Sequence, residues 1–400
     1  MDELPRTLDA TYERALQNID EEKWKYAHRL FQCIAVASRP LRVEELAEFL
    51  AIDFDVGGNP TLVADWRPDD PGNTVLLTCS SLITIVTVDG FSVVQFSHFS
   101  VQEFLMSSRL ASLRVSRYCI SVESAHSIVA LACLSVLFQL DDHINKRSTE
   151  MFPLAGYAAQ HWADHAKFQN VSSFAKYAMH NLFDRDLPHF AAWVRIYDMD
   201  PQSRSSMDPK FLFHPKAPPI YYAILLDFPD MVEWLVTTRP QDVNERGGHY
   251  GTPLCVAAAR GCLRAAQLLV KCGAHVGIAG GNGWSPLLWA SHSGHLELSQ
   301  LLLDHHANIN FRDCLNRTPL SLASEKGHLE TAKLLLQYGA DVNIWERWKG
   351  TVLTKALKRR DLEFAELLLT YGANANARDD DDLRLLHLAS SHSNLVSVPW

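Results

Sequence analysis

Hydrophobic and polar positions in the second half of the chain follow one pattern that returns every 33 residues. The triplets that mark its start are Thr252-Pro253-Leu254, Ser285-Pro286-Leu287, Thr318-Pro319-Leu320, Thr351-Val352-Leu353 and Arg384-Leu385-Leu386. The best copy, TPLSLASEKGHLETAKLLLQYGADVN at residues 318–343, predicts a helix capped by Thr and opened by Pro, a break at Gly327, and a second helix before Gly339. One such copy cannot bury its own apolar face, so neighbouring copies must stack.

In these residues the chain resembles the ankyrin-repeat family, whose repeats form an α-solenoid, and the resemblance covers residues 215–400. A degenerate first repeat precedes the marked ones and has Asp227-Phe228-Pro229 where a Gly turn is expected. The fourth marked repeat has Val352 in place of Pro and Arg360 in place of the turn Gly. The last repeat stops at Trp400, before an outer helix could form, so we expect a poorly covered end to the stack.

Helical and strand-like spacings alternate in the first hundred residues. Residues 21–41 carry apolar side chains at helical spacing, and residues 42–54 predict a second, short helix. β-branched runs at residues 76–88 and 91–98 flank Asp89-Gly90, which is a strong hairpin signal. Helices followed by a hairpin wing predict a winged-helix domain.

The expected fold class is mainly α, with three parts along the chain. A winged-helix domain occupies residues 1–115, a helical connector residues 116–214, and the ankyrin stack residues 215–400. The connector is expected because its apolar side chains form stripes at helical spacing, which is more typical of core packing than of a cofactor site.

Three motifs in the first half carry a second resemblance: LPRTLDATYERAL, ASRPLRVEELAEFLAIDF and VVQFSHFSVQEFL. They resemble the segment just downstream of the nucleotide-binding domain in fungal NACHT-type, NLR-like signalling NTPases, which often continue into ankyrin repeats. The resemblance implies a part in signalling or in self/non-self recognition. No GxxxxGK[ST] motif occurs in the chain, so we expect no nucleotide hydrolysis and no cofactor.

The formal charge of −9 is unevenly distributed. Residues 1–110 hold 9 Lys and Arg against 17 Asp and Glu, whereas residues 216–400 hold 18 against 19. A winged helix can bind DNA, but phosphate contacts need a basic face, so this acidic domain argues against a nucleic-acid partner.

The cysteines and the apolar runs indicate a cytoplasmic protein without a membrane span. The eight cysteines are scattered singly and include no CxxC pair, as expected of reduced core residues. The N-terminus is charged and lacks the apolar region of a signal peptide. The longest apolar run, residues 128–140, is shorter than the roughly twenty residues of a membrane span.

Two motifs could carry chemistry. FSHFSVQEFL, residues 96–105, places His98 and Glu103 near Ser100, as a hydrolase would need, but it also fits a strand that runs into a helix capped by Ser100 and Glu103. HWADH places His161 and His165 one helical turn apart, as metal ligands or as two surface imidazoles. We favour the structural interpretation of both, and expect no enzyme and no metal site.

The register of the ankyrin family suggests where a partner would bind, namely at the finger tips and at inner-helix positions just before the turn Gly. The residues at those positions are Arg246, Arg260, Trp284, His292, Arg312, Arg317, Glu325, Lys326, Trp345, Arg347, Trp348, Lys358, Arg359, Arg378, Asp380 and Asp381. Nine of them are Lys or Arg and three are acidic, although the repeat region as a whole is close to neutral. Segregated charge of this size favours an acidic or phosphorylated protein segment, bound on the concave face of the stack.

Two alternatives stay open at this point. The chain could be a free-standing ankyrin adaptor of an unrelated pathway, or a nucleic-acid-binding regulator. The acidic winged helix argues against the second of these, and salt-dependent DNA binding would favour it.

Overall fold

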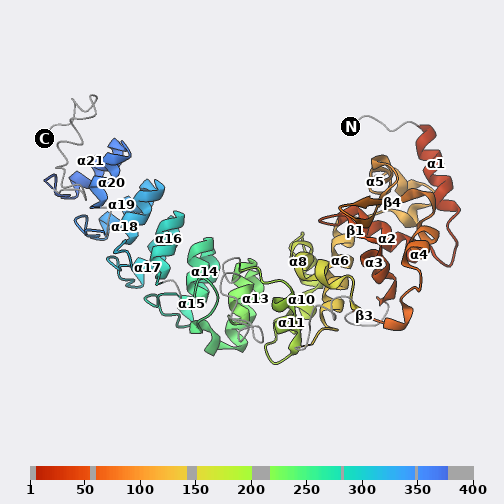
Figure 1. Cartoon of the computed structure of the whole chain (residues 1–400), viewed down its shortest axis with the longest axis horizontal. Coiled ribbons are helices and arrows are strands. Elements are labelled where there is room, and N and C mark those ends of the chain that lie inside the picture. The colour runs from red at the N-terminus through yellow and green to blue at the C-terminus, as the bar shows by residue number, and fades with distance from the viewer. Residues whose placement is uncertain are drawn as a thin grey trace. The chain divides into compact units, whose positions relative to one another are not determined.

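The computed structural model describes residues 6–54, 60–141, 151–200, 217–280, 283–346 and 350–376, and they form a mainly α-helical protein (Figure 1). The chain divides into two compact units. The first unit holds Met1–Met199 with Asp208–Pro215, and the second holds Asp200–Met207 with Lys216–Trp400.

The first unit combines helices with short strands. Its helices are α1 (Arg6–Gln17), α2 (Trp24–Val36), α3 (Val43–Glu48), α4 (Pro71–Cys79), α5 (Phe99–Leu105), α6 (Val122–Leu137), α8 (Ala155–Ala166), α9 (Val171–Phe174), α10 (Lys176–Leu182) and α11 (Pro188–Ile196). Its strands are β1 (Leu41–Arg42), β2 (Ile52–Asp53), β3 (Thr61–Leu62), β4 (Ile83–Val88) and β5 (Phe91–Phe96). Helices α2, α3 and α4 accompany a three-stranded antiparallel sheet of order β1-β5-β4, which is the predicted winged helix.

The hairpin wing forms where it was predicted. Strands β4 and β5 pair from Ile83 opposite Phe96 to Val88 opposite Phe91. Asp89 and Gly90 connect them with φ of 50° and 82°. Both values are positive, as the tight turn that matches strand twist requires.

The sequence predicted a β-strand run that begins at Leu76. This prediction is wrong for the first part of the run, because Leu76 to Cys79 belong to helix α4. Asp70 Oδ1 accepts the Asn73 N–H at 2.9 Å at the start of this helix, and Pro71 occupies its first position. Val75 and Cys79 are buried one helical turn apart. The cap and this buried stripe outweigh the local strand propensity.

An aromatic core holds the connector helices together. The rings of Trp162 on α8 and Trp193 on α11 meet edge to face at 5.5 Å, and Phe183 lies 5.7 Å from Trp193. Trp193 Nε1 donates to the Ala159 carbonyl at 3.0 Å. The apolar stripes of this stretch therefore form core, as predicted.

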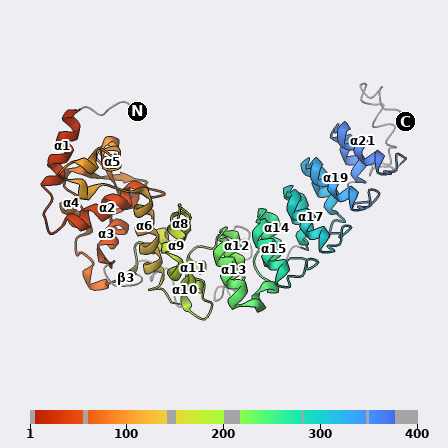
Figure 2. The ribbon, with the colours of Figure 1, turned by 180° about the vertical axis from the view of Figure 1, so that it is seen from behind.

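The second unit is a row of helix pairs (Figure 2). The pairs are α12 (Pro219–Leu225) with α13 (Pro229–Thr238), α14 (Pro253–Arg260) with α15 (Leu263–Lys271), α16 (Pro286–Ser293) with α17 (Leu296–Asp304), α18 (Pro319–Lys326) with α19 (Leu329–Gln337), and α20 (Val352–Lys358) with α21 (Leu362–Thr370). The two degenerate repeats form the turn between their helices without Gly. In them Asp227 and Arg360 adopt the positive φ values, 55° and 62°, that Gly adopts in the other repeats. The final predicted repeat, which starts at Arg384, lies outside the described residues.

Candidate protein-interaction surface

Hydroxyl side chains set the start of each inner helix in the same place. Thr252 accepts the N–H of Cys255 at 3.2 Å, and Thr318 accepts that of Ser321 at 3.2 Å. Ser285 and Thr351 act in the same way on α16 and α20. This N-capping satisfies backbone donors that a helix otherwise leaves unpaired. Residues one repeat apart therefore occupy equivalent positions on successive inner helices.

Histidines that follow the turn glycines join one repeat to the next. His295 Nε2 lies 3.3 Å from the Ala259 carbonyl oxygen, and His328 Nε2 lies 3.1 Å from that of His292. Our sequence reasoning missed this role, although Gly-His recurs at Gly294 and Gly327 with the 33-residue spacing. These bonds fix the spacing of the inner helices and thus of any side chains displayed on them.

Asparagines make a second series of links between the fingers. Asn310 Oδ1 accepts the Asp341 N–H at 2.9 Å, and Asn343 Oδ1 accepts the Asn374 N–H at 2.8 Å. Asn244 Oδ1 accepts the His275 N–H at 2.8 Å in the first finger. The fingers are therefore held in register by side-chain to backbone hydrogen bonds.

Eight of the predicted partner-binding residues are exposed within the described part of the stack. They are Arg246, Arg260, Arg312, Glu325, Lys326, Trp345, Lys358 and Arg359. Trp345, with 44% of its surface exposed, offers the large apolar contact area that often contributes strongly to interfaces. Arg347, Trp348, Arg378, Asp380 and Asp381 lie outside the described residues.

Trp284 and His292 belong to an aromatic cluster instead of standing out from the surface. Trp284 is only 9% exposed, and its ring lies 4.5 Å from Trp289 and 5.2 Å from His292. The Arg317 guanidinium lies over the Trp284 ring at 5.0 Å. Burial lowers the pKa of His292, and the nearby charges of Lys326 and Arg317 lower it further. A neutral imidazole adds no charge to this surface at neutral pH.

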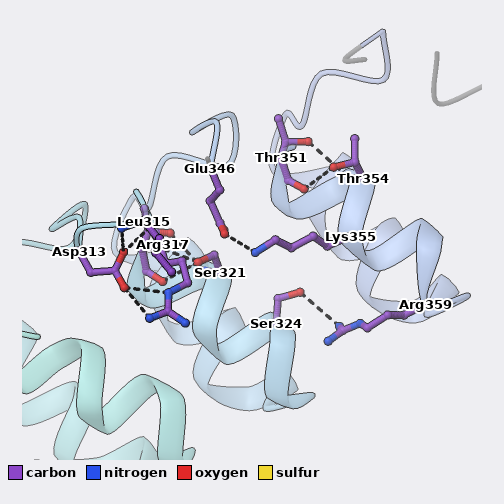
Figure 3. Close-up of polar contacts among 11 residues, drawn as sticks. Asp313, Leu315, Arg317, Ser321, Ser324, Glu346, Thr351, Thr354, Lys355 and Arg359 are labelled. Carbon is purple, nitrogen blue, oxygen red and sulfur yellow. Dashed lines mark hydrogen bonds and ion pairs between the residues drawn. The ribbon is translucent and has the colours of Figure 1, made fainter. Parts of the chain in front are cut away.

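Arg317 forms a structural ion pair within its own finger (Figure 3). The Asp313 side chain is fully buried, and its Oδ2 accepts from Arg317 Nε at 2.8 Å and lies 2.7 Å from Nη2. Its Oδ1 accepts the N–H groups of Leu315 and Arg317, both at 2.9 Å. The charge of Arg317 is thus compensated, so this residue contributes less to a positive surface than its position suggests.

Lys355 forms a second buried pair, which the sequence did not lead us to expect. Its ammonium group contacts the buried Glu346 carboxylate (Figure 3). Lys355 occupies the inner-helix position that Val256, Trp289 and Leu322 fill in other repeats, and this exchange of an apolar residue for Lys is the sequence signal that we missed.

Arg359 links α20 to the preceding inner helix (Figure 3). Its Nη2 lies 3.4 Å from Ser324 Oγ on α18 and 3.7 Å from the Asp361 carboxylate. The side chain remains one-third exposed and keeps part of its charge at the surface.

The FSHFSVQEFL motif forms a strand–helix junction, but the predicted cap is wrong. His98 precedes α5, and its Nδ1 accepts the Ser100 N–H at 3.2 Å. Ser100 Oγ is buried between His98 Nδ1 at 2.6 Å and the Tyr12 hydroxyl at 2.7 Å. The helix begins two residues earlier than predicted, at Phe99, because the imidazole of the extended residue His98 reaches the Ser100 N–H. Glu103 is exposed and is not near this junction's hydrogen bonds.

The two histidines of HWADH point to different surroundings. His161 lies 3.3 Å from the Asp164 carboxylate at the surface. His165 is buried, with Nε2 at 2.8 Å from the Tyr157 hydroxyl and Nδ1 at 2.8 Å from His126 Nδ1. The expectation of two surface imidazoles is therefore wrong for His165. No group of three metal-ligating side chains occurs among the residues that the structure describes.

Comparisons with known proteins match both parts of the chain. Residues 12–115 match the winged-helix domain of GPI inositol-deacylase. Residues 254–345 and 335–389 match two models of ankyrin repeats. The chain therefore carries a winged-helix domain of the NACHT-associated type followed by ankyrin repeats, which confirms both resemblances.

A fungal protein is similar in sequence to part of this chain. The chain is 29% identical over 289 residues to the azaphilone pigments biosynthesis cluster protein L of Monascus ruber. The match covers 68% of this chain and 60% of that protein, so the chain spans less than two thirds of the length of this relative.

A membrane-crossing helix is not found in the described part of the chain, where every helix is too short or too polar for one.

Proposed function

We propose that the ankyrin repeats bind an acidic or phosphorylated protein segment, and that the chain acts as a non-enzymatic recognition module in a cytoplasmic signalling or self/non-self recognition system. Ankyrin repeats are a protein-interaction fold, which supports the general role. The NACHT-associated winged helix supports the signalling context.

Two rows of exposed residues carry the proposal. The finger row consists of Arg246, Arg312 and Trp345, which are 66 and 33 residues apart. The helix-end row consists of Arg260, Lys326 and Arg359, again at multiples of the repeat. Cations at the ends of helices also stabilise the helix dipole, so the helix-end row alone would have a structural explanation. The finger row lies outside the helices, where that explanation does not apply.

The chemistry of these rows suits a flexible anionic segment. Arg donates in a planar fork that fits carboxylate and phosphate groups, and an exposed Trp supplies apolar contact area. Because successive inner helices are joined by His295 and His328, the donors are held at fixed spacing. Preorganised donors of one sign attract an anionic chain and orient it along the stack.

A comparative pull-down tests the proposal. The full chain, the variant Arg312→Glu/Lys326→Glu and the matched control Arg264→Glu/Lys271→Glu would each be exposed to extract at low and high salt. The control residues are exposed on the outer helix α15 and suffer the same change of charge. We expect the first variant to lose partners that the control retains. If both folded variants retain every partner, the binding surface lies elsewhere.

The second candidate is an adaptor for a biosynthetic system. It is favoured by the relative from Monascus ruber, whose name places it in a pigment biosynthesis cluster. The partners recovered in the same pull-down distinguish the two roles, since biosynthetic enzymes would support the adaptor and signalling proteins the recognition module.

A further inference from the structure

A groove of about 510 Å³ with apolar and polar lining residues lies on the winged-helix domain. It is formed by α2, α4 and the 3-10 turn Ala64–Trp66. The residues that shape it are Tyr26, Leu50, Trp66, Pro68 and Leu77. No residue of the ankyrin repeats takes part, so this surface is independent of the proposed function above.

The large side chains of the groove are unusually exposed for apolar residues. Leu77 is 67% exposed, Trp66 49% and Tyr26 40%. On α4 the buried side is made by Val75 and Cys79, which leaves Leu77 to face outward. A contiguous set of this kind on one domain is typical of an interaction site, whereas single exposed apolar residues are ordinary.

Three hydroxyl-bearing residues, Tyr26, Thr74 and Thr78, are among the residues that line the groove. The buried one is Thr78, whose Oγ1 already donates to the Thr74 carbonyl at 2.7 Å. The only charged lining residue of the groove is Lys23 at one end. An occupant therefore needs an apolar face to fill the groove.

Three acidic residues lie close in sequence to the lining of the groove. Glu22, Asp65 and Asp69 are exposed, and each is next in sequence to a lining residue. Of the cations near the groove, Arg67 is engaged by the buried Glu48, Arg29 lies 5.9 Å from the centre of the Tyr26 ring, and Lys23 is part of the lining. The domain as a whole carries the excess of acidic residues noted above, 17 against 9 over residues 1–110. The acidic excess of this domain thus favours a basic occupant.

We propose that this groove binds a basic amphipathic segment of a partner protein. Apolar side chains one helical turn apart would pack on Trp66 and Leu77, and Lys or Arg on the flanks would face the carboxylates of Asp65 and Asp69. An amphipathic helix in an apolar groove is a recurrent mode of peptide recognition.

The test uses the full chain and a pair of designed helical peptides. Both carry the same Leu face, and their other positions are Lys in one peptide and Glu in the other. Fluorescence anisotropy gives their dissociation constants. We expect the Lys peptide to bind at least about tenfold more tightly than the Glu peptide, and Leu77→Ser to weaken it about tenfold, as loss of a central interface residue does.

Two further variants test the charge requirement and the specificity of the groove. Asp65→Asn/Asp69→Asn changes exposed side chains only, so it should fold, and it should weaken the Lys peptide at low salt. Tyr177→Ser removes an equally exposed side chain of α10, 67% accessible, and should leave the affinity unchanged.

Several results would overturn the proposal. They are equal affinity for the two peptides, equal weakening by Tyr177→Ser, or absence of binding by the Lys peptide. A dimer of the full chain that Leu77→Ser dissociates in light scattering would also overturn it, because the groove would then be filled by a second copy.

Discussion

His165 is buried within a chain of hydrogen bonds. The Ser38 N–H can only donate, and it donates to the Tyr157 hydroxyl at 3.0 Å. That hydroxyl lies 2.8 Å from His165 Nε2, and His165 Nδ1 lies 2.8 Å from His126 Nδ1, so both ring nitrogens have hydrogen-bond partners. Burial lowers the pKa of His165 to about 3, and the charges of His126 and His161 add to the effect.

The consequence is a loss of stability in acid. The unfolded imidazole titrates near 6.5 and the folded one near 3, so the unfolded state binds the extra proton between these values. Stability is retained above pH 6.5 and falls as the pH decreases toward 3, by about 2 kcal/mol between pH 7 and pH 5. Urea unfolding followed by circular dichroism measures the fall. His165→Gln keeps a donor and an acceptor without titrating, and it should reduce the pH dependence by this amount; an unchanged dependence would contradict the assignment.

The Glu346–Lys355 pair makes a second prediction at the residue scale. Lys355→Ala leaves a buried carboxylate without its partner, which typically costs about 3–5 kcal/mol. Glu346→Leu/Lys355→Met replaces both charges and should recover most of that loss. Urea unfolding gives the free energies, and Lys333→Ala is the control because its pair with Glu330 is solvent-exposed. A double variant as unstable as the single one would show that the pair is not the cause.

Local signals account for the elements that the sequence predicted correctly. The caps, turn glycines and hairpin are each specified by a few adjacent residues, as at Asp89-Gly90. Helix α4 was missed because its identity depends on the buried side of Val75 and Cys79, which no local pattern shows. The pair of Glu346 with Lys355 was missed for a related reason, since it joins residues of a finger and of the following helix. The same limit applies to Trp284, whose burial depends on neighbours such as Trp289 and Arg317.

The turn glycines allow a prediction at the scale of the helix pair. Gly294 has φ of 75°, and a Cβ there would lie 2.5 Å from His328 Nδ1. Gly294→Ala should therefore strain the turn and displace the imidazole that bonds to the His292 carbonyl, at a total cost of about 1–3 kcal/mol. Gly339 has φ of 86° with no neighbour, so Gly339→Ala should show the backbone strain alone.

Hydrogen exchange on α16 and α19 separates these effects. Gly277→Ala is the control, because a Cβ at that position meets nothing within 4 Å. We expect protection to fall most for Gly294→Ala, less for Gly339→Ala and least for the control. Equal protection in Gly294→Ala and Gly339→Ala would show that the histidine link contributes little.

At the scale of the whole molecule, charge is divided between two kinds of surface. The winged-helix domain carries exposed carboxylates, whereas the finger row and the helix-end row carry cations. A single net charge of −9 hides this division. This division matters for association, because salt at 0.1 M screens exposed charges beyond roughly 10 Å. An approaching partner is therefore attracted or repelled by the charges of the nearest surface and not by the net charge of the protein.

This division gives a kinetic prediction for the partner of the repeats. Exposed cations speed the encounter with an anionic segment, so Arg260→Glu/Lys326→Glu should lower the association rate about tenfold at low salt, and the deficit should disappear near 0.5 M salt as screening removes the attraction. Trp345 contributes contact area and no charge, so Trp345→Ala should raise the dissociation rate at every salt concentration. Biolayer interferometry with a recovered partner measures both rates. The control is Arg264→Glu/Lys271→Glu. If its association rate depends on salt in the same way as that of Arg260→Glu/Lys326→Glu, the partner is attracted by the charge of the whole molecule and not by these two rows.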